Sequence, residues 1–247
     1  MKIYSYSKGI LKEYTNLIDA LKIDLDKDKV VTVVGAGGKT STIYKLSEEI
    51  SNLNKKVVVT TTTHMRLEKD FILVEKQDDL KLVEEALKER NLVKIAKKES
   101  EYKVCSMDLN LLKKVIEMNE NILIEGDGSK NLPLKAPREG EPVIVEETNL
   151  VIGLIGFDSL HKKIKDICHR PENVCRVLKK NLDEIIEYED LIKIAASENG
   201  LKKDVNCKYK VLINKVDDEE KLKECKKIAE LFEKADIDVI FTSYKNI

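Results

Sequence analysis

One glycine-rich turn, placed between a strand and a helix, constrains the fold of this chain more than any other stretch. Val30–Val34 is a run of β-branched apolar residues, which is typical of a strand buried on both faces. The residues after the turn place apolar side chains at the helical period, at Ile43, Leu46 and Ile50. A buried strand that leads through a short turn into a helix predicts an α/β fold with a mostly parallel sheet.

The turn has the composition of a phosphate-binding loop. Its small residues leave backbone N–H groups open to phosphate oxygens at the N-terminus of the helix. Lys39 would contact the β- and γ-phosphates, and the hydroxyl of Thr40 would bind Mg²⁺. The predicted nucleotide-binding residues of the loop are Gly35, Ala36, Gly37, Gly38, Lys39, Thr40 and Ser41. The sequence thus predicts a P-loop NTPase-like domain, a sheet sandwiched by helices, with GTP or ATP and Mg²⁺ as ligands.

The loop is shorter than the full Walker A pattern G-x-x-x-x-G-K-[ST], because Val33 stands at the position of the first glycine. The remaining G-x-G-G-K-T resembles the loop of ligases that activate carboxylates with ATP. An ordinary strand–turn–helix corner with no ligand is the structural alternative.

Composition limits the classes of protein that this chain can belong to. Its 247 residues include 44 Lys and Arg against 45 Asp and Glu, so no basic excess points to nucleic acid. No apolar run approaches the roughly 18 residues that cross a bilayer, and no signal peptide is evident, so we expect a cytoplasmic protein with no membrane partner. Five cysteines without paired spacing favour reduced thiols. The length predicts a single domain over residues 1–247.

Three regions outside the loop carry clear periodicity. Residues 9–24 are predicted to form an amphipathic helix. Residues 71–107 alternate short strands with one helix and form either an inserted small lobe or an extension of the sheet. A strand at 209–213, a helix at 218–234 and a strand at 237–241 predict a last βαβ unit.

Polar residues follow the strand predicted at residues 56–60. Ligands bind beyond the carboxyl ends of strands in open parallel sheets, so these residues are expected beside the nucleotide. Thr62, Thr63 and His64 could orient Mg²⁺, a water molecule or an acceptor substrate. A solvated polar edge is the alternative.

An acidic segment follows the buried strand at 121–125. Glu125 ends this strand and Asp127 comes two residues later, as in the Walker B arrangement, where a carboxylate reaches the metal. Because the two side chains would face opposite sides of a continued strand, we expect unequal roles, with Thr40 completing the metal site. A structural acidic turn is the alternative. The predicted catalytic residues are Lys39, His64, Glu125 and Asp127.

Two further segments supply candidates for contacts with a substrate or partner. Lys135 lies in a proline-rich loop that could form a lid over an anion, or a plain surface connection. Asp158 follows the next strand. His169 and Arg170 stand just before a helix that begins with proline, a position that attracts anions. The nearby Cys168 does not complete a zinc pattern.

The late strand at 209–213 ends in Asn214-Lys215-x-Asp217, the guanine-reading arrangement of GTPases. The carboxylate of Asp217 would accept from two guanine donors that adenine lacks, and the stem of Lys215 would cover the base. The alternative is that Asp217 caps the following helix and Lys215 is solvated.

Together these segments resemble the YqeC family over nearly the whole chain. The motifs that carry the resemblance are Gly35–Thr40, Thr60–His64, Glu125–Ser129, Leu134–Pro137, Glu141–Pro142, Gly153–Asp158, His169–Glu172 and Asn214–Asp217. The resemblance implies a P-loop protein that assists selenium-dependent molybdenum hydroxylases and the synthesis or insertion of their labile selenium cofactor. The selenium role comes from the resemblance, because no spacing in the sequence demands it.

Three functional hypotheses follow. The leading one is a GTP- or ATP-hydrolysing maturation factor whose loops move with the nucleotide. The second is a small-molecule kinase or ATP-dependent ligase, with an acceptor between His64, Lys135 and Arg170. The third is a non-catalytic nucleotide-binding chaperone. The expected partners are a nucleoside triphosphate and a selenium donor or maturation proteins of molybdenum hydroxylases.

Overall fold

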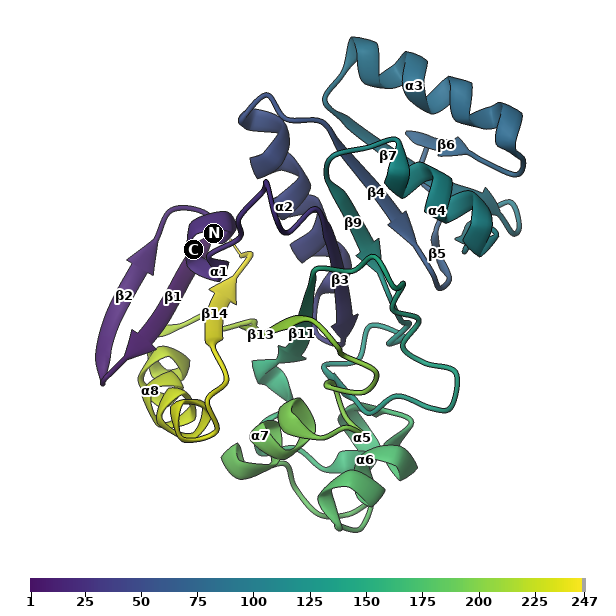
Figure 1. The fold of residues 1–247 in the computed structure, drawn as a ribbon. Coiled ribbons are helices and arrows are strands. Elements are labelled where there is room, and N and C mark those ends of the chain that lie inside the picture. The colour runs from purple at the N-terminus through teal and green to yellow at the C-terminus, as the bar shows by residue number, and fades with distance from the viewer. Residues whose placement is uncertain (246–247) are drawn as a thin grey trace.

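A twelve-stranded sheet with helices on both faces forms the centre of the computed structural model, which describes residues 1–245 (Figure 1). In spatial order its strands are β2 (Ile10–Tyr14), β1 (Lys2–Ser7), β14 (Val239–Ser243), β13 (Lys208–Asn214), β11 (Leu150–Gly156), β3 (Val30–Gly35), β9 (Ile122–Glu125), β4 (Val57–Thr61), β7 (Leu92–Lys98), β8 (Lys103–Cys105) and β5 (Met65–Arg66), with β6 (Phe71–Leu73) paired to β7. The predicted α/β fold with a mostly parallel sheet is confirmed.

The strands from β14 to β7 all run parallel to their neighbours. Every residue of β3, β9, β4 and β11 is buried. Both faces of these strands are covered by helices, which explains their unbroken apolar sequences. Because the strands are parallel, their carboxyl ends meet at one edge of the sheet, where the predicted site residues lie.

Helices cover the two faces unequally. One face carries α1 (Leu17–Leu21) and α2 (Lys39–Asn52), and the other carries α3 (Leu80–Glu89), α4 (Leu109–Glu117), α6 (Pro171–Leu178), α7 (Tyr188–Ala196) and α8 (Glu219–Lys234). A single turn, α5 (Ile164–Ile167), precedes α6. The alternation along β3 shows the division, since Val31 and Val33 pack in the cluster of α2 and Val30 packs in the cluster of α4.

The helix predicted for residues 9–24 is wrong for most of its length. The chain instead forms the hairpin β1–β2, which turns at Lys8 and Gly9 with φ of 49° and 75°. Ile10 and Leu11, which a helix would place against the core, are 71% and 42% exposed. Only residues 17–21 are helical.

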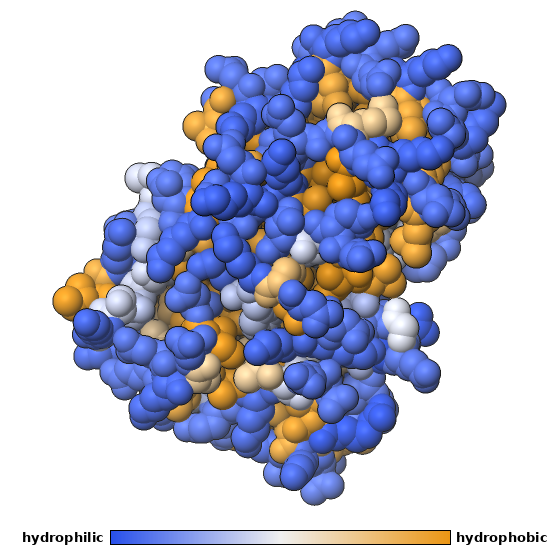
Figure 2. Space-filling model, in the orientation of Figure 1, coloured by the Kyte–Doolittle hydropathy of each residue, from blue (hydrophilic) through white to orange (hydrophobic). Residues whose placement is uncertain are grey.

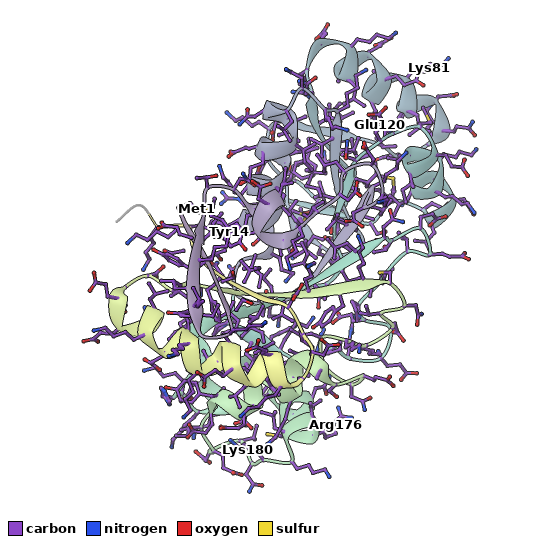
Figure 3. The ribbon with its side chains drawn as sticks, turned by 60° about the vertical axis from the view of Figure 1, so that its left-hand side comes forward. Met1, Tyr14, Lys81, Glu120, Arg176 and Lys180 are labelled. Carbon is purple, nitrogen blue, oxygen red and sulfur yellow. The ribbon has the colours of Figure 1, made fainter. Side chains whose placement is uncertain are left out.

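Pairing with the last strand of the sheet decides this hairpin. β1 lies antiparallel to β14 and buries Ile3 completely, while β2 forms the outer edge. In Figure 3 Met1 and Tyr14 lie close to each other beside the hairpin. The apolar residues of the segment fit either periodicity, so the local pattern could not distinguish them.

Residues 71–107 continue the central sheet past β4. β7 pairs with β4 in parallel, and β8 and β5 follow in antiparallel order. A small apolar cluster of Met65, Phe71, Ala96 and Val104 lies at this edge. The segment is thus an extension of the sheet that carries a small core of its own.

A separate two-stranded sheet connects two of the predicted substrate segments. β10 (Leu134–Lys135) pairs in parallel with β12 (Cys168–His169), so that Lys135 lies opposite His169. This pairing joins the proline-rich loop to the segment just before α6. Two stretches more than thirty residues apart in sequence thereby form one wall beside the sheet edge.

The molecular surface seen in Figure 2 is mainly hydrophilic, with hydrophobic residues showing in separate patches. This agrees with a chain in which 36% of residues are charged. Within residues 1–245, no helix combines the length and the apolar character needed to cross a membrane.

Candidate functional site

The glycine-rich turn packs so closely on its neighbours that side chains would not fit. Gly35, Gly37 and Gly38 have φ of 95°, 94° and 130°, a region that favours glycine. A Cβ on Gly37 would lie 2.3 Å from the backbone nitrogen of Gly156, and a Cβ on Gly38 would lie 2.5 Å from Nδ2 of Asn214. The loop backbone therefore rests directly on β11 and β13 at the N-terminus of α2, where free N–H groups attract anions.

Lys39, the first residue of α2, is held by the loop and by one carboxylate behind it. Its Nζ donates to the carbonyl of Gly35 at 2.7 Å and lies 3.4 Å from Oδ1 of Asp127. The same carboxylate accepts from the backbone N–H of Gly35 at 3.0 Å. Asp127 thus fixes both the loop backbone and the loop lysine, and it does so from beyond the end of β9.

Glu125 and Thr40 form an oxygen pair at the carboxyl end of β9. The hydroxyl of Thr40 donates to Oε2 of Glu125 at 2.8 Å. Burial raises the pKa of Glu125, against the attraction of Lys39 and the bond from Thr40. Within residues 1–245, no three His, Cys, Asp or Glu side chains gather to hold a metal by themselves. Two oxygens beside a phosphate loop fit Mg²⁺, which usually takes its remaining ligands from phosphate and water.

Lys135 was expected to face a substrate anion, but in the structure its side chain points into the protein interior. Its side chain is fully buried, and its ammonium lies 2.8 Å from Oδ2 of Asp127 and 3.1 Å from Oε2 of Glu141. It also donates to the carbonyl of Gly128 at 2.8 Å. Lys135 therefore links Asp127, which holds the glycine-rich loop, to Glu141 of the proline-rich loop.

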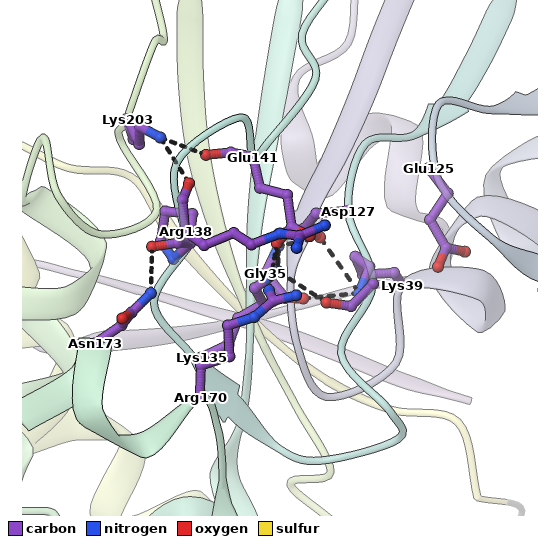
Figure 4. A network of polar contacts seen from close by, with 12 residues as sticks. Gly35, Lys39, Glu125, Asp127, Lys135, Arg138, Glu141, Arg170, Asn173 and Lys203 are labelled. Carbon is purple, nitrogen blue, oxygen red and sulfur yellow. Dashed lines mark hydrogen bonds and ion pairs between the residues drawn. The ribbon is translucent and has the colours of Figure 1, made fainter. Parts of the chain in front are cut away.

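The carboxylate of Glu141 contacts three cationic side chains (Figure 4). Besides Lys135, its oxygens accept from Arg170 at 2.6 Å and from Arg138 at 3.0 Å. Burial raises the pKa of Glu141, but Lys135 and Arg170 outweigh this effect and lower it below its usual range. The ammonium of Lys203 donates to the carbonyls of Arg138 and Glu141, at 2.8 and 2.7 Å. These contacts fix the proline-rich loop against the rest of the fold.

A cleft of about 1040 Å³ opens in front of the loop and these side chains. Its floor is the N-terminus of α2, one wall is the 128–141 loop with the start of α6, and the opposite wall comes from residues 63–68 and 99–103. The predicted residues that line the cleft are Gly37, Gly38, Lys39, Thr40, Ser41, Thr63, His64, Glu125, His169, Arg170 and Lys215. The predicted residues outside this lining are Gly35, Ala36, Thr62, Asp127, Lys135, Asp158, Asn214 and Asp217.

Comparison with known proteins assigns the chain to a family. The sequence model of the YqeC protein family matches residues 31–172, which include the glycine-rich loop, the acidic strand end and the proline-rich loop. The chain is also 32% identical over 206 residues to the uncharacterized protein YqeC of Escherichia coli strain K12, covering 79% of this chain and 80% of that protein. The chain belongs to the YqeC family.

The threonines at the end of β4 and directly after it have a structural role in this YqeC family member. The hydroxyl of Thr61 donates to the carbonyl of Glu125 at 3.0 Å, and that of Thr62 donates to the carbonyl of Val143 at 3.0 Å. His64 is more than half exposed and pairs with Glu99 at 3.0 Å. Only Thr63 and His64 of this segment therefore face the cleft.

His169 is the second histidine in the cleft and is 8% exposed. Burial lowers the pKa of His169 to about 4, and the cations Arg170, Lys135 and Lys130 lower it in the same direction. The imidazole is therefore neutral near neutral pH.

The Asn214–Asp217 segment of this YqeC family member connects the glycine-rich loop to the last strand, β14. Nδ2 of Asn214 donates to the carbonyl of Gly37 at 2.9 Å, and its Oδ1 accepts from Thr242 at 3.0 Å. Asp217 accepts from the hydroxyl of Ser243 at 2.7 Å and lies 2.9 Å from the ammonium of Lys245. Burial raises the pKa of Asp217, but these two contacts outweigh it and lower the pKa.

Beside this segment, Lys215 pairs with Asp158 at 2.7 Å. The two residues come from the ends of the neighbouring strands β13 and β11. Asp158 therefore positions the lysine that was predicted to cover a base.

The sequence analysis missed several functional candidates. Ser243 and Lys245 contact Asp217 from the end of β14, and Arg138 and Lys130 line the cleft from the proline-rich loop. One signal was available, because polar residues directly after the last parallel strand share the sheet edge with the other site residues. For Lys130 and Arg138 the local sequence contains no such signal, since their place depends on the fold of a loop.

Proposed function

We propose that this protein binds a nucleoside triphosphate with Mg²⁺, prefers GTP, and turns it over. The observation that carries the proposal is the loop of left-handed glycines at the start of α2, with Lys39 and the Thr40–Glu125 pair beside it. Backbone N–H groups and one buried ammonium suit the β- and γ-phosphates. Neither feature is needed for a plain strand–turn–helix corner.

Thr40 and Glu125 are the residues that would hold Mg²⁺. A bound Mg²⁺ would neutralise charge that develops on the phosphates during transfer. The chain itself would orient the phosphates through the loop amides and Lys39, while Asp127 holds both in place. Asp127 has no free oxygen directed at the cleft in this arrangement, so the metal role falls to Glu125.

The preference for GTP rests on Asp217. Its carboxylate lies at the end of β13, next to the strand end that receives the loop, and is held by Ser243 and Lys245. Guanine offers N1–H and an exocyclic amine to such a carboxylate, and adenine offers neither in that position. The bond from Asn214 to Gly37 ties the base-reading segment to the phosphate loop.

The biological role in the proposal is assistance to the synthesis or insertion of a labile selenium cofactor of molybdenum hydroxylases. This part rests on the family resemblance. Deletion of the gene should lower the selenium content and activity of these hydroxylases while the amount of enzyme protein is unchanged. Wild-type protein should restore both, and Lys39→Ala should restore neither.

A second candidate function is phosphoryl or adenylyl transfer to a small molecule. The specific observation is the cleft, in which the wall made by the 128–141 loop and the start of α6 carries cations that do not belong to the glycine-rich loop. A protein that only hydrolyses its nucleotide does not need such a wall. The acceptor would lie between that wall and the phosphate loop.

Binding and turnover by the purified chain test the proposal. We expect calorimetry to give a lower Kd for GTP than for ATP, and Mg²⁺-dependent release of a product. Free phosphate identifies hydrolysis, and a phosphorylated or adenylated acceptor in mass spectrometry identifies transfer. Binding without turnover would support the chaperone hypothesis, and failure of both nucleotides to bind would overturn the proposal.

A further inference from the structure

We propose that the cleft binds a second ligand, one that carries a phosphate group, on a basic wall formed by Lys130, Arg138 and Arg170. This inference rests on the proposed function, because the ligand would be the molecule on which the energy of the nucleotide is used. The three residues belong to the 128–141 loop and the start of α6, and all three line the cleft. They are separate from the glycine-rich loop that would hold the nucleotide.

The charges that line the cleft favour an anion beyond the nucleotide. Seven side chains are cationic and four are acidic, an excess of three positive charges. The cationic ones are Lys39, Arg66, Lys103, Lys130, Arg138, Arg170 and Lys215, and the acidic ones are Glu68, Glu99, Glu125 and Glu141. The chain as a whole has a net charge of −1, so this excess is a local property of the cleft.

The ion network behind the wall leaves positive charge unbalanced. Asp127 and Glu141 are its two carboxylates, and they contact four cations, which are Lys39, Lys135, Arg138 and Arg170. Lys39 is assigned to the nucleotide, so Lys135, Arg138 and Arg170 remain against the two carboxylates, and Lys130 beside them supplies a second unbalanced positive charge. A phosphate monoester dianion would balance these two charges. Figure 4 shows the guanidinium groups of Arg138 and Arg170 meeting at Glu141.

The same ion network holds the arginines of the wall in place before a ligand binds. Arg138 and Arg170 are already positioned by Glu141, so less side-chain freedom is lost when an anion binds. Each planar guanidinium keeps further N–H donors in the fork that matches phosphate oxygens. Lys130 forms no ion pair with any residue in the described part of the chain, 1–245, and its ammonium is available. The neutral imidazole of His169 adds a hydrogen-bonding group without adding charge.

A small phosphorylated molecule fits this wall better than a nucleic acid. The wall has three cations inside a cleft of about 1040 Å³, which the nucleotide would share. Nucleic acid needs a basic stripe along an open surface. A simple carboxylate carries one charge per group and would leave the cluster partly unbalanced. The geometry therefore points to a ligand of low mass that ends in a phosphate.

Inorganic phosphate is the probe that tests this wall. The full chain is first saturated with a non-hydrolysable GTP analogue and Mg²⁺, so that the glycine-rich loop is filled, and phosphate binding is then followed by the ³¹P line width. We expect wild-type protein to bind phosphate in this state. Lys130→Gln and Arg138→Gln should each weaken that binding about fivefold or more, and their combination should weaken it further. The affinity for the GTP analogue should stay unchanged.

Lys179→Gln is the matched control. Lys179 is an exposed lysine with φ of 57° at the far end of α6, and Lys130 is an exposed lysine with φ of 49°. The control should bind phosphate as the wild type does. Thermal unfolding should show that all variants keep the fold, because Lys130 and Arg138 are exposed and neither belongs to the core.

Three results would overturn the inference. The first is no binding of phosphate to the nucleotide-loaded wild type, the second is wall variants that bind phosphate as well as the control does, and the third is displacement of phosphate by acetate at equal concentration. Failure of the proposed function is a different result. If the nucleotide does not bind, phosphate is titrated into Lys39→Ala protein without nucleotide. If Lys39→Ala protein binds phosphate, and if adding Lys130→Gln and Arg138→Gln removes this binding, the result would support the phosphate site on the basic wall without supporting nucleotide binding.

Discussion

At the scale of single residues, Lys39 is the most direct test of the phosphate loop. Within residues 1–245, its buried ammonium contacts the Gly35 carbonyl and Asp127, and it would face several phosphate charges. Lys39→Ala should therefore cost about 2–4 kcal/mol of nucleotide binding or transition-state stabilisation, measured by calorimetry and turnover. Lys45→Ala, further along α2 and outside the cleft, is the control and should change neither. Unchanged affinity and turnover in the Lys39 variant would rule out the loop assignment.

The two carboxylates after β9 should behave differently. Glu125 lines the cleft with Thr40, so Glu125→Gln should reduce Mg²⁺-dependent turnover while the fold remains stable. Asp127 is buried between Lys39 and Lys135, so Asp127→Asn should lower the free energy of unfolding by about 3–5 kcal/mol, because both buried cations lose a carboxylate, although Lys135 keeps its contact with Glu141. Urea unfolding and turnover assays on both variants make the comparison. Equal effects in both assays would contradict these separate roles.

Base preference depends on Asp217. A carboxylate that accepts from two guanine donors is partly unpaired beside adenine, a difference of about 2–4 kcal/mol. Asp217→Asn should weaken GTP and improve XTP, since the amide can donate to the xanthine 2-carbonyl. Competition binding with GTP, ATP and XTP measures this exchange. The structure rules out the alternative that Asp217 caps α8, because the N-cap is Asp218, whose side chain accepts from the N–H of Lys221. If the wild type prefers ATP and Asp217→Asn alters no nucleotide, Asp217 only contacts Ser243 and Lys245.

His169 gives the fold a dependence on pH. Burial and the neighbouring cations lower its pKa to about 4 in the folded protein, against an ordinary value of 6.5. Between these values the unfolded chain binds the proton more readily, so the stability that His169 permits at neutral pH is lost as the pH falls from 6.5 to 4. His169→Asn should make this decrease shallower in urea unfolding. An NMR titration in which His169 becomes protonated near pH 6.5 would contradict the expectation.

At the scale of elements, the N-terminal hairpin shows how a correct apolar pattern can suggest the wrong structure. Ile3 of β1 is fully buried, whereas Ile10 of β2 is 71% exposed. Ile3→Ala should destabilise the protein by about 2–5 kcal/mol, and Ile10→Ala should change its stability by less than about 0.5 kcal/mol. The two thermal unfolding curves make this comparison. A large effect of Ile10→Ala would favour a packed helix over residues 9–24.

The proline-rich loop is an element whose function depends on its attachments. β10 pairs with β12, Lys135 pairs with Asp127, and Lys203 holds the backbone of Arg138 and Glu141. Its prolines indicated an extended path, but the residues that attach it lie far away in sequence. The proline-rich loop therefore connects the glycine-rich loop to the basic wall through a short chain of ion pairs.

At the scale of the whole molecule, one continuous sheet assembles the site. The ends of β3, β9, β4, β11 and β13 supply the glycine-rich loop, the acidic residues, the threonines, Asp158 and the Asn214–Asp217 segment. The helices on both faces bury these strands, and the cleft of about 1040 Å³ opens at this edge. Residues from position 35 to position 217 meet there because the strands are parallel and adjacent.

The sequence by itself determined the α/β fold, the central strands, the glycine-rich loop and the family. These follow from short-range patterns, because burial on both faces forces apolar strands and a phosphate loop needs small residues next to Lys39 and Thr40. Only the tertiary structure decided the outer parts and the roles within the site. Whether residues 10–14 form a strand depended on β14, and whether Lys135 faces a ligand or the interior depended on Asp127 and Glu141. The physical reason is that burial and ion pairing join residues distant in sequence, and a local pattern contains no information about those partners.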